Sequence, residues 1–220
     1  MSTLLITGFE PFGGESVNPS SLAAVEAART LASKLPGVSV VSAVLPVSYR
    51  RAREAVRDLV EKHKPDVAIA LGQAGGLAYV AVERVAVNLM DTGSPDNDGY
   101  APVDEPIEPG APAAYFSTLP VRLIVKKLRE AGIPAALSYF AGTFICNLVM
   151  FELLHLSATR GWPRRAGFLH LPYLPEQAAS KRSWCGYAPS MARELLTRAV
   201  EIAALTSLER LDAGDERIPL

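Results

Sequence analysis

The sequence predicts an α/β fold: a three-layer α/β/α sandwich around a twisted, mostly parallel (mixed) sheet. Three observations carry this prediction. Short apolar runs that are typical of strands alternate with amphipathic helical segments along all 220 residues. One run, residues 67–71, is apolar at every position, as expected for a strand that helices cover on both faces. No internal repeat or linker interrupts the alternation, so we expect a single domain, residues 1–220.

The expected elements follow one another with short connections. Apolar runs predict strands at residues 3–8, 38–47, 67–71, 79–88, 135–140 and 166–170. Apolar residues at helical spacing predict helices that begin near Asn18, Ser48, Val121, Leu148 and Pro189. We expect Val25 and Leu195 on the buried faces of the first and last helices, and Arg53 and Arg57 on a solvent-exposed face of the second.

Residues 90–116 break the pattern, because they are rich in Pro, Gly and Asp and show no regular period. A loop of this length in a compact domain is usually functional or mobile. It can serve as a lid, a binding loop or an oligomer contact, and the sequence does not choose among these roles. At the end of the chain, residues 212–220 are expected to be frayed.

Composition and charge exclude several classes of protein. Hydrophobic residues make up 49% and charged residues 20% of the chain, which is the profile of a globular protein rather than a disordered one. Lys and Arg number 22 against 23 Asp and Glu, so no basic field can hold nucleic acid or an anionic membrane. The first residues lack the pattern of an export signal, and the most apolar window, 135–150, is too short and mixed to span a bilayer.

These observations favour a cytoplasmic protein with neither a nucleic-acid nor a membrane partner. In a reducing compartment both cysteines, Cys146 and Cys185, are expected to be free thiols. No CxxC or HxxxH spacing occurs, and the three histidines lie far apart in the sequence. We therefore expect neither a metal site nor a redox dithiol.

Cys146 stands where a strand-like run turns into a helix. Residues 135–140 lead into Ala-Gly-Thr, and an apolar helical segment begins at Leu148. The free N–H groups of a helix start favour negative charge, so a thiol there loses its proton more easily and becomes a nucleophile. The alternative is that Cys146 is a buried and inert cysteine, which is common in intracellular proteins.

Two more polar residues stand in apolar runs. His170 ends the strand at 166–170 and enters a Pro-rich turn, where α/β enzymes place catalytic groups; a purely structural role is the alternative. Glu83, in the run 79–88, either faces solvent on an edge strand or points into a site near Gln73 and holds a histidine. With Cys146 these residues are the parts of a Cys–His–acid nucleophilic site.

Four segments carry a resemblance to a known family and occur in its order. They are Thr-Gly-Phe-Glu-Pro-Phe-Gly-Gly at 7–14 with Asn-Pro-Ser at 18–20; Gly-Gln-Ala-Gly-Gly at 72–76 with 83–88 and 95–97; Ala-Gly-Thr-Phe-Ile-Cys-Asn at 141–147; and 168–177. At these segments the chain resembles the pyroglutamyl peptidases (pyrrolidone carboxyl peptidases). The resemblance implies a cytosolic cysteine peptidase that removes an N-terminal pyroglutamyl residue from peptides. It also implies an α/β/α fold, a homotetramer and no cofactor.

The resemblance further assigns the site. It implies that Cys146 is the nucleophile, His170 the general base and acid, and Glu83 the partner of the histidine. It places Phe9, Phe12, Phe144 and Ile145 around the lactam ring and Gln73 near the site. Asn18 is also expected to bind substrate. A neutral, flat ring suits apolar and aromatic walls with a few polar groups, whereas a charged ammonium would be buried there without a partner.

Two positions depart from the family pattern. Gly93 and Ser94 stand where members usually carry Arg-Ile, and Leu77 stands where an arginine usually follows Gln-Ala-Gly-Gly. The arginine before Pro-Asp-Asn is thought to position the substrate or stabilise the oxyanion. The alternative function is therefore a catalytically weakened homologue that binds pyroglutamyl peptides without efficient turnover, and a third is another thiol amidase on the same scaffold. The intact Cys–His–Glu set favours turnover.

Overall fold

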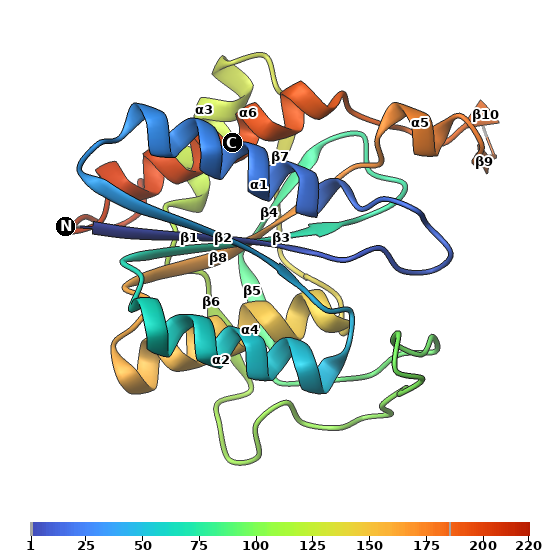
Figure 1. Cartoon of the computed structure of the whole chain (residues 1–220), viewed down its shortest axis with the longest axis horizontal. Coiled ribbons are helices and arrows are strands. Elements are labelled where there is room, and N and C mark those ends of the chain that lie inside the picture. The colour runs from blue at the N-terminus through green and yellow to red at the C-terminus, as the bar shows by residue number, and fades with distance from the viewer. Residues whose placement is uncertain (1, 185) are drawn as a thin grey trace.

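The computed structural model describes residues 2–184 and 186–220. Within them, six strands form the central sheet in the order β2–β1–β3–β8–β4–β7 (Figure 1). The strands are β1 (Ser2–Phe9), β2 (Val38–Leu45), β3 (Val67–Gln73), β4 (Val80–Glu83), β7 (Ala135–Ser138) and β8 (Arg165–Leu171). β2, β1, β3 and β8 run parallel, whereas β4 is antiparallel to β8 and parallel to β7. The predicted mixed, mostly parallel sheet is confirmed.

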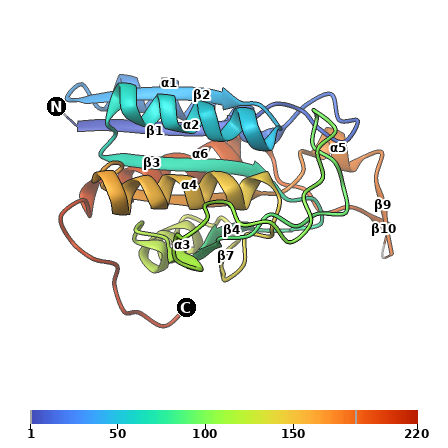
Figure 2. The ribbon, with the colours of Figure 1, turned by 90° about the horizontal axis from the view of Figure 1, so that it is seen from below.

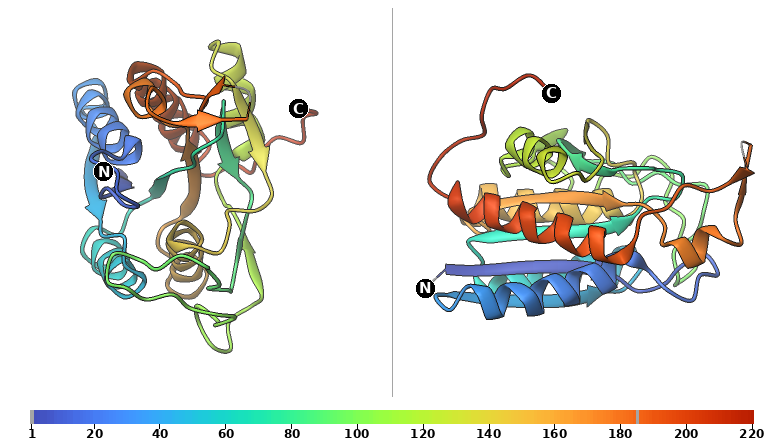
Figure 3. Two further views of the ribbon diagram at one scale, coloured as in Figure 1. Left: turned by 90° about the vertical axis from the view of Figure 1, so that its right-hand side faces the viewer. Right: turned by 90° about the horizontal axis from the view of Figure 1, so that it is seen from above.

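Helices cover both faces of this sheet, as the edge-on view in Figure 3 shows. One layer contains α1 (Pro19–Lys34), α3 (Val121–Glu130) and α6 (Arg193–Glu209), and the other contains α2 (Tyr49–His63) and α4 (Ile145–Arg160). Figure 2 looks onto the layer of α2 and α4. Strand alternation divides the core, because Leu4 and Ile6 pack with α1 while Leu5 packs with α2. The predicted three-layer α/β/α architecture is confirmed.

The starts of two helices follow local sequence signals. The Asn18 side chain accepts a hydrogen bond from the Ser20 N–H at 3.0 Å and caps α1, and Ser48 accepts one from the Arg51 N–H at 3.2 Å and caps α2.

No helix in the described residues has the length and apolar character that a membrane span needs.

The buried faces of α1 and α6 differ from the prediction. Val25 is 49% exposed and Leu195 is 39% exposed. The two helices pack against each other through small residues instead, including Ala24, Ala28 and Ala203. Close helix packing selects alanine at the contact, and helical spacing of larger residues does not reveal that choice.

Two further local predictions are corrected, and the loops after β8 contain elements that were not predicted. The run at 79–88 is not one strand: β4 ends at Glu83, and β5 (Val85–Val87) pairs with β6 (Ala114–Phe116) in a separate sheet. The loops after β8 contain short α5 (Pro175–Ala178) and the pair β9 (Arg182–Ser183) and β10 (Gly186–Tyr187), which projects from the body (Figure 1). The tail is anchored, because the Asp215 carboxylate accepts hydrogen bonds from the Arg122 and Leu123 N–H groups.

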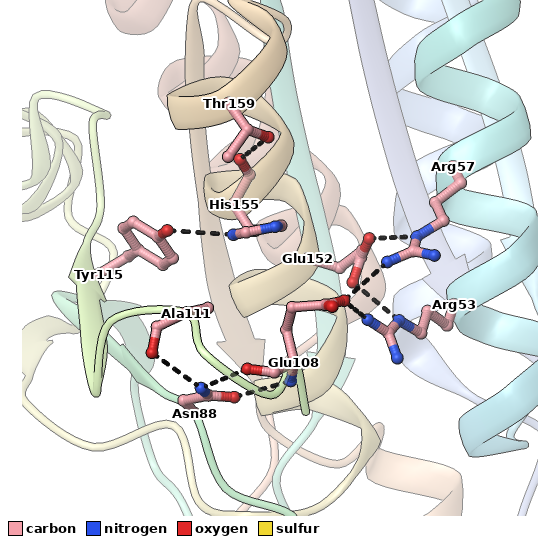
Figure 4. A network of polar contacts seen from close by, with 9 residues as sticks. All are labelled: Arg53, Arg57, Asn88, Glu108, Ala111, Tyr115, Glu152, His155 and Thr159. Atoms are coloured by element: carbon pink, nitrogen blue, oxygen red, sulfur yellow. Dashed lines mark hydrogen bonds and ion pairs between the residues drawn. The ribbon is translucent and has the colours of Figure 1, made fainter. Parts of the chain in front are cut away.

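Apart from β6 at its end, the segment 90–116 is irregular, as predicted, but side chains hold it against the body. Asn88 accepts a hydrogen bond from the Glu108 N–H and donates to the Glu108 and Ala111 carbonyls (Figure 4). Ile107 and Asp96 are buried. The expectation that Cys185 is a free thiol lies outside the described residues.

A cluster of ion pairs joins this segment to both helices of one layer. Glu152 of α4 is fully buried, and its oxygens lie 3.0 Å from Arg53 Nε and 2.5 Å from Arg57 Nε (Figure 4). Both arginines also pair with Glu108. Arg53 and Arg57 are only partly exposed, so the prediction of a fully solvent-exposed face is wrong at these two positions. Their partners lie about a hundred and about fifty positions away in the sequence, so no local pattern marks them.

Replacing both arginines, in Arg53→Met/Arg57→Met, should destabilise the fold by about 3 to 5 kcal/mol, because it leaves the Glu152 carboxylate buried without a partner. Glu152→Gln should cost clearly less, since both arginines are partly exposed and keep Glu108. Urea unfolding measures both losses. Arg50→Met is the control, because the Arg50–Glu54 pair is exposed and should contribute less than about 1 kcal/mol. A Glu152→Gln loss as large as that of the double variant would contradict this prediction.

Candidate active site

Strand pairing brings Glu83 and His170 together. His170 of β8 lies between Gly72 of β3 and Ala81 of β4 in the register. Glu83 is two residues beyond Ala81, so its side chain points to the same face of the sheet and lies diagonal to His170. Glu83 Oε1 and His170 Nδ1 are 2.7 Å apart. Glu83 is only 2% exposed and lies on an interior strand, so the solvent-facing alternative for this residue is wrong.

Cys146 reaches the same place from the helix layer. It is the second residue of α4, as the strand-to-helix turn predicted. Its sulfur lies close to Gly72, the residue that pairs with His170 in the strand register, and its charge acts on the ring. Glu83 occupies Nδ1 of the ring, so Nε2 is the nitrogen left free for a reacting group. Cys146, His170 and Glu83 therefore lie in one cluster, in which Glu83 holds the ring.

Gly72 makes room for the sulfur. A Cβ atom on residue 72 would lie 2.8 Å from Cys146 Sγ and 2.7 Å from Phe168 Cζ, well inside van der Waals contact. Any side chain on β3 at this position would therefore displace the thiol from His170. The requirement for glycine here comes from space, and not from a left-handed backbone.

The start of α4 is available to an anion. Phe144 is its N-cap residue, and no side chain hydrogen-bonds the first N–H groups. In α1 and α2 the corresponding groups are satisfied by Asn18 and Ser48. Free N–H groups beside a nucleophile are suited to stabilise a developing oxyanion.

The electrostatics favour an ion pair between ring and thiol. Burial opposes a charge on His170, but the negative charge and hydrogen bond of Cys146, together with those of Glu83, outweigh it and raise the pKa of His170 to about 10. The imidazolium is thus held through neutral pH. Glu83 Oε2 is buried and has no hydrogen-bond partner in the described part of the chain, so Glu83 acts on the site through Oε1.

All six predicted substrate-binding residues line one small pocket together with Cys146. They are Phe9, Phe12, Asn18, Gln73, Phe144 and Ile145. The rings of Phe12 and Phe144 lie 6.2 Å apart, so one side of the pocket is aromatic. Val47 also lines it and was not predicted, because an apolar residue after a strand carries no functional signal.

The two polar residues of the pocket differ in what they offer a ligand. Asn18 is used internally: Oδ1 accepts from Ser20, and Nδ2 donates to the Glu10 carbonyl. Gln73 Oε1 accepts a hydrogen bond from Gln177 Nε2 at 2.9 Å. Gln73 Nε2 has no partner among the described residues. Asn18 therefore shapes the wall, and Gln73 supplies a free donor.

Sequence reasoning missed two residues that hold the nucleophile turn. Asn147 is fully buried, and its side chain accepts a hydrogen bond from the Val87 N–H and donates to the Val87 and Leu89 carbonyls. Tyr49 Oη donates to the Thr143 carbonyl at 3.2 Å, and its ring packs edge-on against Phe144. Asn147 lies within the 141–147 segment, but its bonds to a distant strand are not readable from that segment.

Comparison with known proteins decides the family. The family model for pyroglutamyl peptidase matches residues 2–210. The chain belongs to this family. A pyrrolidone-carboxylate peptidase from Thermococcus onnurineus is 50% identical over 94% of this chain and 98% of its own length, and one from Thermococcus litoralis is 48% identical over 100% of both. The solved structure of a pyrrolidone carboxyl peptidase from Thermococcus litoralis matches with a TM-score of 0.93 and 47% identity, covering 100% of each chain. The predicted family is confirmed.

Replacing the Cys146 thiol should lower the pKa of His170. In Cys146→Ser the ring loses the neighbouring negative charge, so the pKa of His170 should fall from about 10 toward its ordinary value near 6.5. NMR titration of the His170 Cε1–H resonance measures both values. Since the folded pKa is the raised one, the charged ring stabilises the fold fully below about 6.5, and this contribution is lost as pH rises through about 10. Equal pKa values in wild type and variant would disprove the ion pair.

Proposed function

We propose that this protein is a cysteine peptidase that hydrolyses the N-terminal pyroglutamyl residue from peptides through Cys146, His170 and Glu83. One observation carries the proposal: Cys146, beside the paired His170 and Glu83, lines the same pocket as Phe9, Phe144 and the other predicted substrate-binding residues. The relatives named pyrrolidone-carboxylate peptidase support the same activity.

The geometry fits acyl transfer to sulfur. The Cys146 thiolate attacks the carbonyl carbon of the pyroglutamyl residue, and the N–H groups at the start of α4 stabilise the oxyanion. His170 then gives its proton to the leaving amine as the C–N bond breaks, which leaves a thioester. Neutral His170 next takes a proton from water, and the resulting attack releases pyroglutamate and restores the thiolate. Glu83 holds the ring through Nδ1 in both steps.

The pocket explains the choice of substrate. Phe9, Phe12 and Phe144 offer apolar walls to a flat ring, and Gln73 Nε2 offers a donor to the ring oxygen. The pocket lining contains no carboxylate that could neutralise an ammonium group. A peptide with an ordinary N-terminus would therefore bury its charge without a partner.

We further propose the setting in which the enzyme works, from the family resemblance and the chemistry of the thiol. The chain acts as one peptidase domain, residues 1–220, in the cytoplasm, where reduction keeps Cys146 a free thiol. It needs no cofactor, because the nucleophile, the proton carrier and the oxyanion donors all come from the protein. It assembles as a homo-oligomer, which the resemblance makes a tetramer, and its partners are N-terminally pyroglutamylated peptides.

Pure, reduced wild-type protein should release the fluorophore from a pyroglutamyl coumarin amide, and Cys146→Ser should lose at least about 10³-fold in kcat, because serine beside His170 is a far weaker nucleophile than a thiolate. Cys185→Ser is the matched control and should be nearly silent. Cleavage unaffected in Cys146→Ser would sink the nucleophile assignment. Wild type that binds the amide without cleaving it would favour the weakened homologue instead.

Gly72→Ala should also lower kcat/KM, by about 10²-fold, because the added Cβ displaces the Cys146 sulfur from His170. Gly37→Ala is the matched control, since a Cβ there meets no atom within 4 Å. The rate of Cys146 alkylation by iodoacetamide should fall along with kcat. Full activity in Gly72→Ala would show that Cys146 does not need the space beside Gly72.

A further inference from the structure

Gln177 connects the pocket to a charged pair at the surface. It lies in α5, is 5% exposed and does not line the pocket. Its Nε2 lies 2.9 Å from Gln73 Oε1, 3.0 Å from Glu15 Oε2 and 3.3 Å from the Val17 carbonyl oxygen. Its Oε1 accepts a hydrogen bond from the Leu174 N–H at 3.1 Å.

These contacts allow one orientation of the Gln177 amide. Three acceptors surround its nitrogen, and a main-chain N–H faces its oxygen. If the amide were flipped, its oxygen would face those acceptors and its nitrogen would face the N–H, so these hydrogen bonds would be lost. Lys181 completes the series: its ion pair with Glu15 outweighs the effect of burial and lowers the pKa of that carboxyl, so Glu15 is an acceptor at neutral pH. The nitrogen of Gln177 therefore has to point at Gln73.

The orientation of Gln73 follows from that of Gln177. Since Gln177 offers only a donor, Gln73 turns Oε1 toward it and keeps Nε2 free. The pocket then presents a hydrogen-bond donor beside its apolar walls. A ring oxygen can accept from this donor, whereas a second donor or an unsubstituted ring carbon would leave it unpaired.

We propose that Gln177 and Glu15 are positioning residues that orient the Gln73 amide so that it presents a hydrogen-bond donor to the pocket. This orientation selects five-membered rings with an oxo group next to the ring nitrogen. The proposal rests on the proposed function and concerns specificity rather than bond cleavage. Neither residue touches Cys146 or His170, so their loss should raise KM and leave kcat nearly unchanged.

The sharpest test replaces the amide donor at residue 177 by a carboxylate acceptor and keeps a hydrogen bond between residues 15 and 177. In Glu15→Gln, residue 15 still accepts from Gln177, so KM for a pyroglutamyl coumarin amide should stay within about twofold of wild type. In Glu15→Gln/Gln177→Glu, residue 15 donates to the new carboxylate, which now accepts from Gln73 Nε2 and turns Oε1 into the pocket. At pH 8.5, KM and the Ki of 2-pyrrolidone should both rise by about tenfold or more, with kcat within about threefold of wild type.

Lowering the pH provides a readout that a purely structural role does not move. A protonated carboxyl at residue 177 can donate to Gln73 Oε1, so the KM defect of the double variant should shrink between pH 8.5 and pH 5.5. Gln177→Met removes the donor without adding a titrating group, and its smaller KM defect should not change with pH. Glu176→Met is the control on α5, because Glu176 is exposed and should leave KM unchanged.

Three results would overturn the proposal: an unchanged KM and Ki in the double variant, a defect confined to kcat, or a defect that does not change with pH. The rate of Cys146 alkylation by iodoacetamide and the thermal unfolding midpoint verify that each variant keeps the site. A wild type without hydrolysis defeats the proposed function itself. Normal wild-type turnover with an unchanged KM in the double variant defeats only the role of Gln177 and Glu15.

Discussion

The close approach of Cys146 to the sheet at Gly72 is the constraint on which the active site depends. α4 begins directly over the carboxyl end of β3, and the missing side chain at residue 72 lets the sulfur reach His170 on the neighbouring strand. One register between β3 and β8 therefore sets both the space below the nucleophile and the position of its base. Because backbone pairing defines these positions, the reacting groups stand on the most rigid part of the molecule.

The same strand pairing controls the charges. His170 is buried, where an isolated imidazolium would be unfavourable, yet the hydrogen bond from Glu83 at Nδ1 and the charge of Cys146 favour the charged ring. The charge on His170 therefore depends on both neighbours, which links the chemistry of the thiol to the fold around it.

Local signals in the sequence predicted what depends on local structure. Asn18 and Ser48 cap helices, Cys146 lies at a helix start, and His170 lies near a strand end, each within a few residues of the pattern that indicated it. The errors concern contacts between distant segments. Arg53 and Arg57 looked like a solvated helix face because Glu152 and Glu108 are far away in the chain. Val25 and Leu195 looked like core residues because the alanine contact of α1 with α6 has no period of its own. Cys146, Glu83 and His170 were grouped as a Cys–His–acid site from their places in the sequence, and the family resemblance then assigned a role to each.

The segment 90–116 supports the pocket through its buried side chains rather than through its exposed turn. Asp96 accepts a hydrogen bond from the Tyr49 N–H, and Tyr49 in turn holds the Thr143 carbonyl and the Phe144 ring. The Asn97 N–H donates to the carbonyl of Val47, which lines the pocket directly. Gly93 and Ser94 are exposed and lie outside the pocket lining. The departure from the family pattern at these two positions therefore leaves in place the contacts that fix the aromatic wall. The ring pocket and the Cys146 turn keep their support from Asp96 and Asn97.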